Sequence, residues 1–427
     1  MRAKLGDVEA CGRLVMTMRA LTADRLIDGE SSTPLQDGAV VYDGDRIVAV
    51  GPRDEVVEPG MEVHDFPGCT LLPGLADCHL HLSLDGEGSF ELGMLKDLTS
   101  LTAIRATEYV LRDLTAGFTS IRACADKGFI DVGLARAIDL GYVMGPRVFS
   151  SGHMLTVTGG RDSFIPGVSF ADNLFEECDG VEGTARAARR QLKYGVDWVK
   201  LGVTGAVSAG EGLPGAQQFS EEEMRAAVEC AHRYGKKVAG HAHGADGIKA
   251  AVRAGVDSIE HGWLADREAV EMMVSAGTYW VPTLAPLHFN LLHGTEGGIP
   301  ESVVERTRSV QENMLQMFQL GMELGANFVM GTDVGMPFNY HGGNAVELRL
   351  MVEAGMSEVD ALLSATSSAA EMLDMGEEIG RLAPSLRADV VVVRDDPTND
   401  ITTVSDPVFV MKDGIIVRDD MVPVDAG

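Results

Sequence analysis

The sequence lacks the features that would direct a chain into or across a membrane. Its first residues contain no continuous apolar stretch, so no secretory signal is predicted there. No window approaches the roughly 18 consecutive apolar residues that suggest a membrane-spanning helix. These two absences predict a cytoplasmic protein that does not associate with membranes.

Cysteine pairs with metal-binding or redox spacing are absent as well. The cysteines are scattered along the chain and include no Cys-x-x-Cys pair: they are Cys11, Cys69, Cys78, Cys124, Cys178 and Cys230. This pattern argues against a disulfide framework and predicts buried or free thiols in a reducing compartment.

Basic residues are scarce relative to acidic ones. The chain has 35 Lys and Arg against 64 Asp and Glu, which gives a net charge of −29. A surface of this charge repels phosphate backbones, so nucleic-acid binding is not expected. It also repels small anionic substrates unless their binding site supplies local positive charge.

Apolar residues, in contrast, are plentiful enough for a large core. The chain has 427 residues, 45% of them hydrophobic, which suits one large barrel or two to three average domains. We expect residues 1–18 to form a disordered extension, with Met16 or Met18 as alternative starts of the protein.

The two ends of the chain resemble each other and differ from the middle. Residues 38–51 read as a β-hairpin around the turn Asp43-Gly44-Asp45, and the tail repeats the pattern around Lys412-Asp413-Gly414. We therefore expect residues 19–68 and 381–427 to pair as one small β-sandwich domain.

The middle of the chain, residues 69–380, alternates short apolar strands with amphipathic helical segments. One helix is expected to open with the capping box Ser220…Glu223 and to stop at Gly235. Alternating strands and helices predict an α/β fold, a (β/α)₈ barrel, although periodicity alone leaves a doubly wound open sheet as an alternative. The eight expected strands lie within residues 69–82, 118–125, 147–152, 196–203, 237–244, 258–263, 279–284 and 327–335.

Polar side chains follow several of these strands. His79 and His81 are two residues apart on a strand, so their imidazoles share one face, an arrangement that suits a metal. Such a pair alone is weak evidence and can equally be two hydrogen-bonded histidines. In a barrel, however, the ends of all strands converge on one face. The other polar groups at strand ends are Lys200, His241, His261 and Asp333.

The segments PGLADCHLHL, WVK, GHAHG, IEHG and GTDVG, in this order, resemble the amidohydrolase superfamily. More narrowly, GFTSIR, GPRVFSSGH, TVTGG, WVPTL and GRLAPSLRADVVVV are similar to its binuclear prolidase-type members, which remove a C-terminal residue. The resemblance covers nearly the whole chain after Leu21.

The resemblance implies a complete site with two divalent metals, most naturally Zn²⁺, with Mn²⁺ or Co²⁺ as alternatives. His79 and His81 would bind the more buried metal, and His241 and His261 the more exposed one. Lys200, carboxylated by CO₂, would bridge the two. Asp333 would bind the buried metal and, as the catalytic proton shuttle, serve a metal-bridging hydroxide that attacks the amide.

Four further residues are candidates for binding substrate. His243 shares the face of His241, but a supporting role is equally expected. His153, in SSGHML, is a candidate for holding a substrate carboxylate. Arg122 could face the substrate or form a salt bridge in the barrel wall. Arg161 lies where this chain reads GGRDS and relatives often read GGHGD, a departure that puts substrate identity in doubt. The stretch 286–300 is expected to be a long loop after the seventh strand, either a lid or an ordinary ordered excursion.

We therefore expect a homo-oligomeric hydrolase that releases an amino acid from a small-molecule amide, either a dipeptide or an N-acyl amino acid. The first alternative is a xenobiotic amide hydrolase, acting on ochratoxin-type amides, carbamates or phenylureas. A mononuclear deaminase is a weaker alternative because it does not need Lys200. A non-catalytic binding protein is weaker still because the ligand set is complete.

Overall fold

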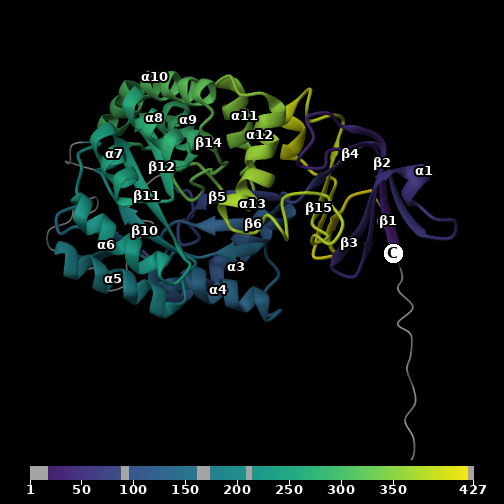
Figure 1. The fold of residues 1–427 in the computed structure, drawn as a ribbon, viewed down its shortest axis with the longest axis horizontal. Coiled ribbons are helices and arrows are strands. Elements are labelled where there is room, and N and C mark those ends of the chain that lie inside the picture. The colour runs from purple at the N-terminus through teal and green to yellow at the C-terminus, as the bar shows by residue number, and fades with distance from the viewer. Residues whose placement is uncertain (1–17, 88–95, 161–173, 208–213, 422–427) are drawn as a thin grey trace, which may run out of the picture.

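The computed structural model describes residues 18–87, 96–160, 174–207 and 214–421. A helix-rich barrel stands beside a β-rich part that both ends of the chain build (Figure 1). The predicted extension over residues 1–18 lies, apart from Met18, outside the described residues. Arg161 lies outside them too.

The β-rich part is one hydrogen-bonded sheet of seven strands drawn from both termini. Its order is β17-β16-β15-β4-β1-β2-β3, and both predicted hairpins are present. The two halves of the chain meet where β4 and β15 pair antiparallel, with Leu72 opposite Val391. The strands are β1 (Arg19–Leu26), β2 (Leu35–Asp43), β3 (Arg46–Pro52), β4 (Glu62–Pro73), β15 (Val390–Arg394), β16 (Phe409–Lys412) and β17 (Ile415–Asp419).

This sheet folds back on itself around its own core, as the predicted sandwich requires. Leu21, Phe66 and Phe409, from three different strands, belong to one buried apolar cluster. The two hairpin turns touch, because a Cβ added to Gly414 would lie 1.8 Å from the carbonyl oxygen of Gly44. Only glycine permits so close an approach at this point.

The second sheet system is a (β/α)₈ barrel, as predicted. Parallel pairing joins β5, β6 and β7 in one sheet and β10 to β14 in another. The ring closes where the amide of Trp198 bonds the Ser150 carbonyl and that of Cys78 bonds the Met330 carbonyl. Its strands are β5 (Leu75–Leu80), β6 (Phe118–Ala123), β7 (Arg147–Phe149), β10 (Trp198–Gly202), β11 (Lys237–Gly244), β12 (Ser258–Leu264), β13 (Tyr279–Val281) and β14 (Asn327–Phe328), with β8 (Met154–Thr156) and β9 (Phe175–Glu177) extending the sheet beside β10.

Residues 69–82, expected to form a single barrel strand, are divided between the two sheets. β4 ends at Pro73 in the small sheet, and β5 begins at Leu75 in the barrel. Between them, a Cβ on Gly74 would meet Thr119 Oγ1 at 2.1 Å, so the chain passes too close to β6 for any side chain. The passage from small sheet to barrel therefore lies at Gly74.

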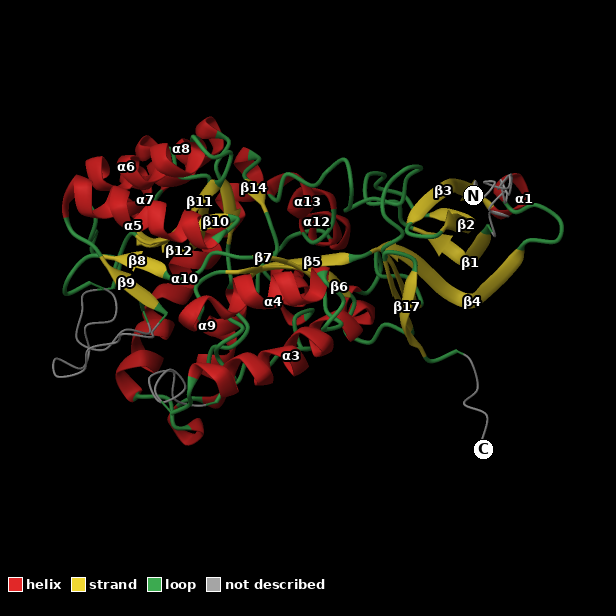
Figure 2. Ribbon diagram, turned by 90° about the horizontal axis from the view of Figure 1, so that it is seen from below, coloured by secondary structure: helices red, strands yellow, loops and turns green. Residues whose placement is uncertain are grey.

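Helices surround the barrel, as both views show (Figures 1 and 2). The predicted capping box of Ser220 and Glu223 is present and opens α6. The helices are α1 (Arg53–Val56), α3 (Thr99–Thr115), α4 (Ile130–Asp139), α5 (Gly180–Tyr194), α6 (Glu221–His232), α7 (Ala245–Ala254), α8 (Arg267–Ala276), α9 (Leu284–His293), α10 (Glu301–Leu324), α11 (Val346–Glu353), α12 (Glu358–Ser364) and α13 (Ser367–Met372). The helices of the described part of the chain include none with the length and apolar character needed to cross a bilayer.

The expectation of a long loop over residues 286–300 is wrong. Most of this stretch lies in α9, whose buried Leu287 packs into the barrel core, and a 3₁₀ turn follows at Thr295–Gly297. The first two amides of α9 donate to the buried carboxylate of Glu347, at 2.7 and 2.8 Å. This anchored helix is not a lid.

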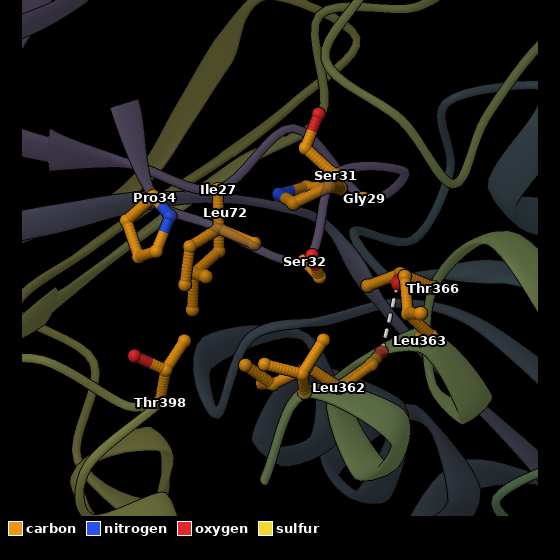
Figure 3. Close-up of a pocket in the computed structure, with 12 residues that line it drawn as sticks. Ile27, Gly29, Ser31, Ser32, Pro34, Leu72, Leu362, Leu363, Thr366 and Thr398 are labelled. Atoms are coloured by element: carbon orange, nitrogen blue, oxygen red, sulfur yellow. Dashed lines mark hydrogen bonds between the residues drawn. The ribbon is translucent and has the colours of Figure 1, made fainter. Parts of the chain in front are cut away.

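The small sheet joins the barrel through apolar side chains. Ile27 and Leu72 of the sheet and Leu362 of α12 line a small pocket at the junction (Figure 3). The described residues that line this pocket include none of the predicted site residues. The candidate site therefore lies elsewhere, at the ends of the barrel strands.

Candidate metal centre

Six predicted metal ligands lie at the carboxyl ends of five barrel strands or just beyond them. His79 is on β5 and His81 follows it, Lys200 is on β10, His241 on β11, and His261 on β12. Asp333 follows β14 and reaches the same place, since its amide donates to the His79 carbonyl at 2.6 Å. All six are 4% exposed or less. The barrel therefore brings residues that are far apart in the sequence close together in space.

The side chains fall into two donor groups. His79, His81 and Asp333 place one ligand atom each within 4.8 Å of one another, and so do His241, His243 and His261. The groups are adjacent, because the rings of His79 and His261 are 5.0 Å apart, centroid to centroid. The two groups of donors are therefore neighbours, and His243 lies among the donors of the second.

Three of these histidines have their Nδ1 atoms occupied. His81 Nδ1 lies 2.8 Å from the Ala125 carbonyl, which can only accept a hydrogen bond. His261 Nδ1 lies 2.6 Å from Thr283 Oγ1, whose own proton is donated to the Pro282 carbonyl. His79 Nδ1 lies 2.7 Å from a carboxylate oxygen of Glu260. Each Nδ1 therefore carries the proton, and each Nε2 keeps its lone pair for the centre.

Burial favours the uncharged forms of the central nitrogens. It lowers the pKa of His79 to about 4, with the nearby Lys200 charge adding to the effect. Burial also lowers the pKa of Lys200, whose Nζ has no hydrogen-bond partner within the described residues. A buried, unpartnered amine is unusual unless another group completes it. Carboxylation by CO₂ would do so, and would convert the amine into an anionic oxygen ligand.

The backbone is strained at two of the ligands. His261 and Asp333 have φ values of 73° and 57°, in the left-handed region that costs non-glycine residues about 1–3 kcal/mol. Nearby, a Cβ on Gly331 would lie 2.8 Å from the Cβ of His79, so glycine lets the Asp333 loop approach β5. The two carboxyl-side loops are thus bent toward the centre at an energetic cost.

Arg122 forms a salt bridge, which was the alternative expectation for it, but inside the barrel and not in its wall. The side chain is fully buried, and it donates to the Cys78 carbonyl at 2.6 Å and to Glu260 on the opposite strand β12 at 2.8 and 2.9 Å. A buried guanidinium is stabilised by a buried carboxylate, and these contacts occupy the Arg122 donors.

The other candidates for binding substrate lie in different environments. His243 is buried beside the metal ligands, with its ring 4.7 Å from that of His241 and 4.6 Å from that of Trp263. His153 is half-buried after β7, and its ring packs edge-on against Phe129 at 4.3 Å. The prediction for Arg161 falls outside the described residues.

Sequence reasoning missed the carboxylates that support the ligands. Glu260 bonds His79, and Asp77 accepts hydrogen bonds from Thr332, Asn344 and the His79 amide. Burial raises the pKa of Asp77 to about 6. The available signal was an acidic residue inside an apolar strand, one or two positions from a ligand histidine, because a buried carboxylate needs a partner.

The residues present fit a pair of divalent metals. The convergent Nε2 lone pairs, the Asp333 carboxylate and the unpartnered Lys200 amine form the mixed nitrogen and oxygen donor set of zinc, manganese or cobalt sites. Without cations, these buried nitrogen and oxygen atoms would lie close together with no positive charge to coordinate.

Comparison with known proteins agrees with this geometry. The amidohydrolase family model matches residues 70–417, so the chain belongs to the amidohydrolase family. It falls in the prolidase-type group of that family and is a hydrolase acting on carbon–nitrogen bonds.

Three proteins illustrate the similarity. The ochratoxinase of Aspergillus niger is 31% identical over 412 residues, covering 90% of this chain and 83% of that protein. A crystal structure of a Xaa-Pro dipeptidase with methionine bound in its active site has 33% identity and a TM-score of 0.86, covering 93% of this chain and 99% of that one. A prolidase complexed with N-methylphosphonate-L-proline has 31% identity and the same TM-score, covering 94% and 100%.

Proposed function

We propose that this protein is a binuclear metalloamidase that releases the C-terminal amino acid of a dipeptide or an N-acyl amino acid. The observation that carries the proposal is the presence of two adjacent groups of buried donors at the ends of the barrel strands, with the buried Lys200 amine beside them and the Nε2 lone pairs of three histidines available. Similarity to a Xaa-Pro dipeptidase and a prolidase supports the choice of substrate class.

The candidate residues would have distinct roles in binding the metals. His79, His81 and Asp333 would hold one metal, His241 and His261 the other, and the carboxylated Lys200 would bridge them. When bound, the metals would make an attacking water available at neutral pH and polarise the scissile carbonyl. Zn²⁺ suits the donors best, with Mn²⁺ or Co²⁺ as alternatives.

Asp333 would move the proton. Its Oδ1 lies 3.0 Å from His81 Nε2 and 3.6 Å from His79 Nε2, so the carboxylate stands at the centre of the cluster. From there it would take a proton from the attacking water and deliver it to the leaving nitrogen. The strained backbone at Asp333 holds it in this place.

The substrate carboxylate needs a partner in a chain of net charge −29. His153 is our candidate, because it is only half-buried and the next residue, Met154, pairs with Lys200 of β10. Arg122 is unavailable, since Glu260 and the Cys78 carbonyl occupy its donors.

A matched pair of substrates tests this proposal. Zinc-loaded enzyme should cleave free-acid dipeptides and N-acyl amino acids with kcat/KM at least about tenfold above their C-terminal amides, since one charge-assisted hydrogen bond is lost on amidation. His153→Ala should erase most of this preference, whereas the exposed His232→Ala should keep it. Equal cleavage of both forms by the wild-type enzyme would refute the carboxypeptidase proposal.

A second candidate is hydrolysis of a xenobiotic amide, which similarity to ochratoxinase favours. Amides in which an amino acid is joined to an aromatic acid belong in the same substrate screen as the dipeptides. Metal content separates the remaining classes, because a binuclear hydrolase binds two ions per chain, a deaminase one and a binding protein none.

The expectation of a homo-oligomer also remains a proposal. Large apolar side chains are exposed on α3 and just after α4, and monomers rarely leave such surface uncovered. These side chains are Leu98, Leu101, Ile104, Leu140, Tyr142 and Met144.

A further inference from the structure

A buried ion pair crosses the barrel directly beneath the metal centre. Arg122 comes from β6 and Glu260 from β12, and both side chains are fully buried. The guanidinium contacts both oxygens of Glu260, at 2.8 and 2.9 Å. A buried pair of this kind is costly to form and adds little net stability on its own, so its presence calls for another role.

Glu260 connects this pair to a metal ligand. Its Oε2 lies 2.7 Å from His79 Nδ1, while its Oε1 accepts from Ser258 Oγ at 2.5 Å. Both carboxylate oxygens of Glu260 therefore have hydrogen-bond partners. An ionised carboxylate can only accept hydrogen bonds, so its oxygen beside His79 requires a donor there. A neutral imidazole beside such an acceptor must carry its proton on Nδ1, which leaves the lone pair on Nε2.

Arg122 keeps Glu260 in that state. Its guanidinium donates to both carboxylate oxygens, at 2.8 and 2.9 Å, and a carboxylate held by a cation in this way offers its neighbours only acceptor atoms. The same guanidinium donates to the carbonyl of Cys78, the residue before His79, and lies 4.5 Å above the ring of Trp198 on β10. Arg122 therefore contacts the backbone of β5 at Cys78 and also holds Glu260, the hydrogen-bond partner of the His79 side chain.

We propose that Glu260, braced by Arg122, is a positioning residue that sets the tautomer of His79 and so makes Nε2 available to the buried metal. The inference rests on the proposed metal function and adds a residue to it. Carboxylate partners of ligand histidines commonly change metal affinity about 10–100-fold when they are removed.

Two substitutions separate this role from a packing role. Glu260→Gln keeps the shape of the side chain. Ser258 Oγ and Arg122 both donate to Oε1, so the Gln oxygen is expected there, which turns the amide N–H toward His79 Nδ1 and shifts the imidazole proton to Nε2. Glu260→Asp keeps an acceptor-only carboxylate but is one methylene shorter. If Glu260 only fills space, the Gln variant should preserve zinc binding better than the Asp variant. If Glu260 sets the tautomer of His79, the Asp variant should preserve it better.

The experiment measures zinc binding and histidine tautomers in the full-length chain. We expect Glu260→Gln to lose one of two zinc ions, with the affinity of that site reduced about 10–100-fold. We expect Glu260→Asp to keep both ions. In protein labelled with ¹⁵N-histidine, the Gln variant should show one histidine whose proton has moved from Nδ1 to Nε2. Ser258→Ala is the matched control, because it removes the hydrogen bonds of Ser258 Oγ with Glu260 and Arg122 but leaves the bond between Glu260 and His79 in place.

The outcomes are distinct. Two zinc ions bound by Glu260→Gln with wild-type affinity, or zinc lost equally from the Gln and Asp variants, would overturn the positioning role while leaving the proposed function intact. A wild-type chain that binds no zinc would overturn both. If Glu260→Gln is insoluble, the Asp variant alone decides, since zinc bound with wild-type ¹⁵N shifts supports the inference and zinc lost despite native folding refutes it.

Discussion

Deleting the tail after Ser385 should prevent the protein from folding in soluble form. The deletion removes β15, β16 and β17, which contribute seven side chains with no exposed surface, Val390–Val393 and Phe409–Met411. Burial of such side chains is worth about 1.5–3 kcal/mol each, so the loss is on the order of 10–20 kcal/mol. Whole domains are stable by only about 5–15 kcal/mol, so the remaining chain should not hold its fold.

The deletion also exposes β4 as a free edge from Cys69 to Pro73, which invites aggregation. The assay is the soluble fraction after expression, followed by circular dichroism and thermal melting of any soluble protein. A deletion after Met421 is the control, because it spares all strands of the sheet and should melt like the full chain. A soluble, active protein ending at Ser385 would refute the reasoning and make the tail a dispensable appendage.

Two further predictions concern the metal centre. Lys200→Ala should lose metal and nearly all activity, because the bridging ligand is gone; a short carboxylic acid in excess should partly restore both, and full activity with two metals retained would exclude Lys200 as a bridging ligand. Asp333→Asn should keep most of the metal but lower kcat by about 10²–10⁴-fold, since a proton shuttle is lost; a change confined to KM in steady-state kinetics would show that Asp333 only binds substrate.

The candidate ligands were identified in the sequence because each lies at or just after a short apolar strand. His79, Lys200, His241 and Asp333 are polar groups at the ends of buried segments, and in a barrel such positions converge on one face. The same rule does not separate Arg122 from the candidate ligands. It also lies near the end of a strand and points into the barrel, but its donors are taken up by Glu260 and the Cys78 carbonyl, and strand position alone does not show this.

The supporting carboxylates were not predictable in this way. Glu260 and Asp77 precede ligand histidines, yet their partners Arg122, Thr332 and Asn344 come from other parts of the chain. Sequence spacing carries no information about such pairs. The split of residues 69–82 at Gly74 was equally hidden, because it depends on the approach of Thr119 from β6.

The sequence by itself determined the elements, their alternation and the kinds of ligand atom, since these follow from local apolar periodicity and from the chemistry of each side chain. Only the tertiary structure decided which nitrogen of each histidine faces the centre, which buried charges compensate one another and where the backbone is strained. These features depend on contacts across the barrel, such as Glu260 with His79 and Thr283 with His261. Their physical cause is the low polarity of the interior, where every buried proton and charge must find a partner that only folding brings within reach.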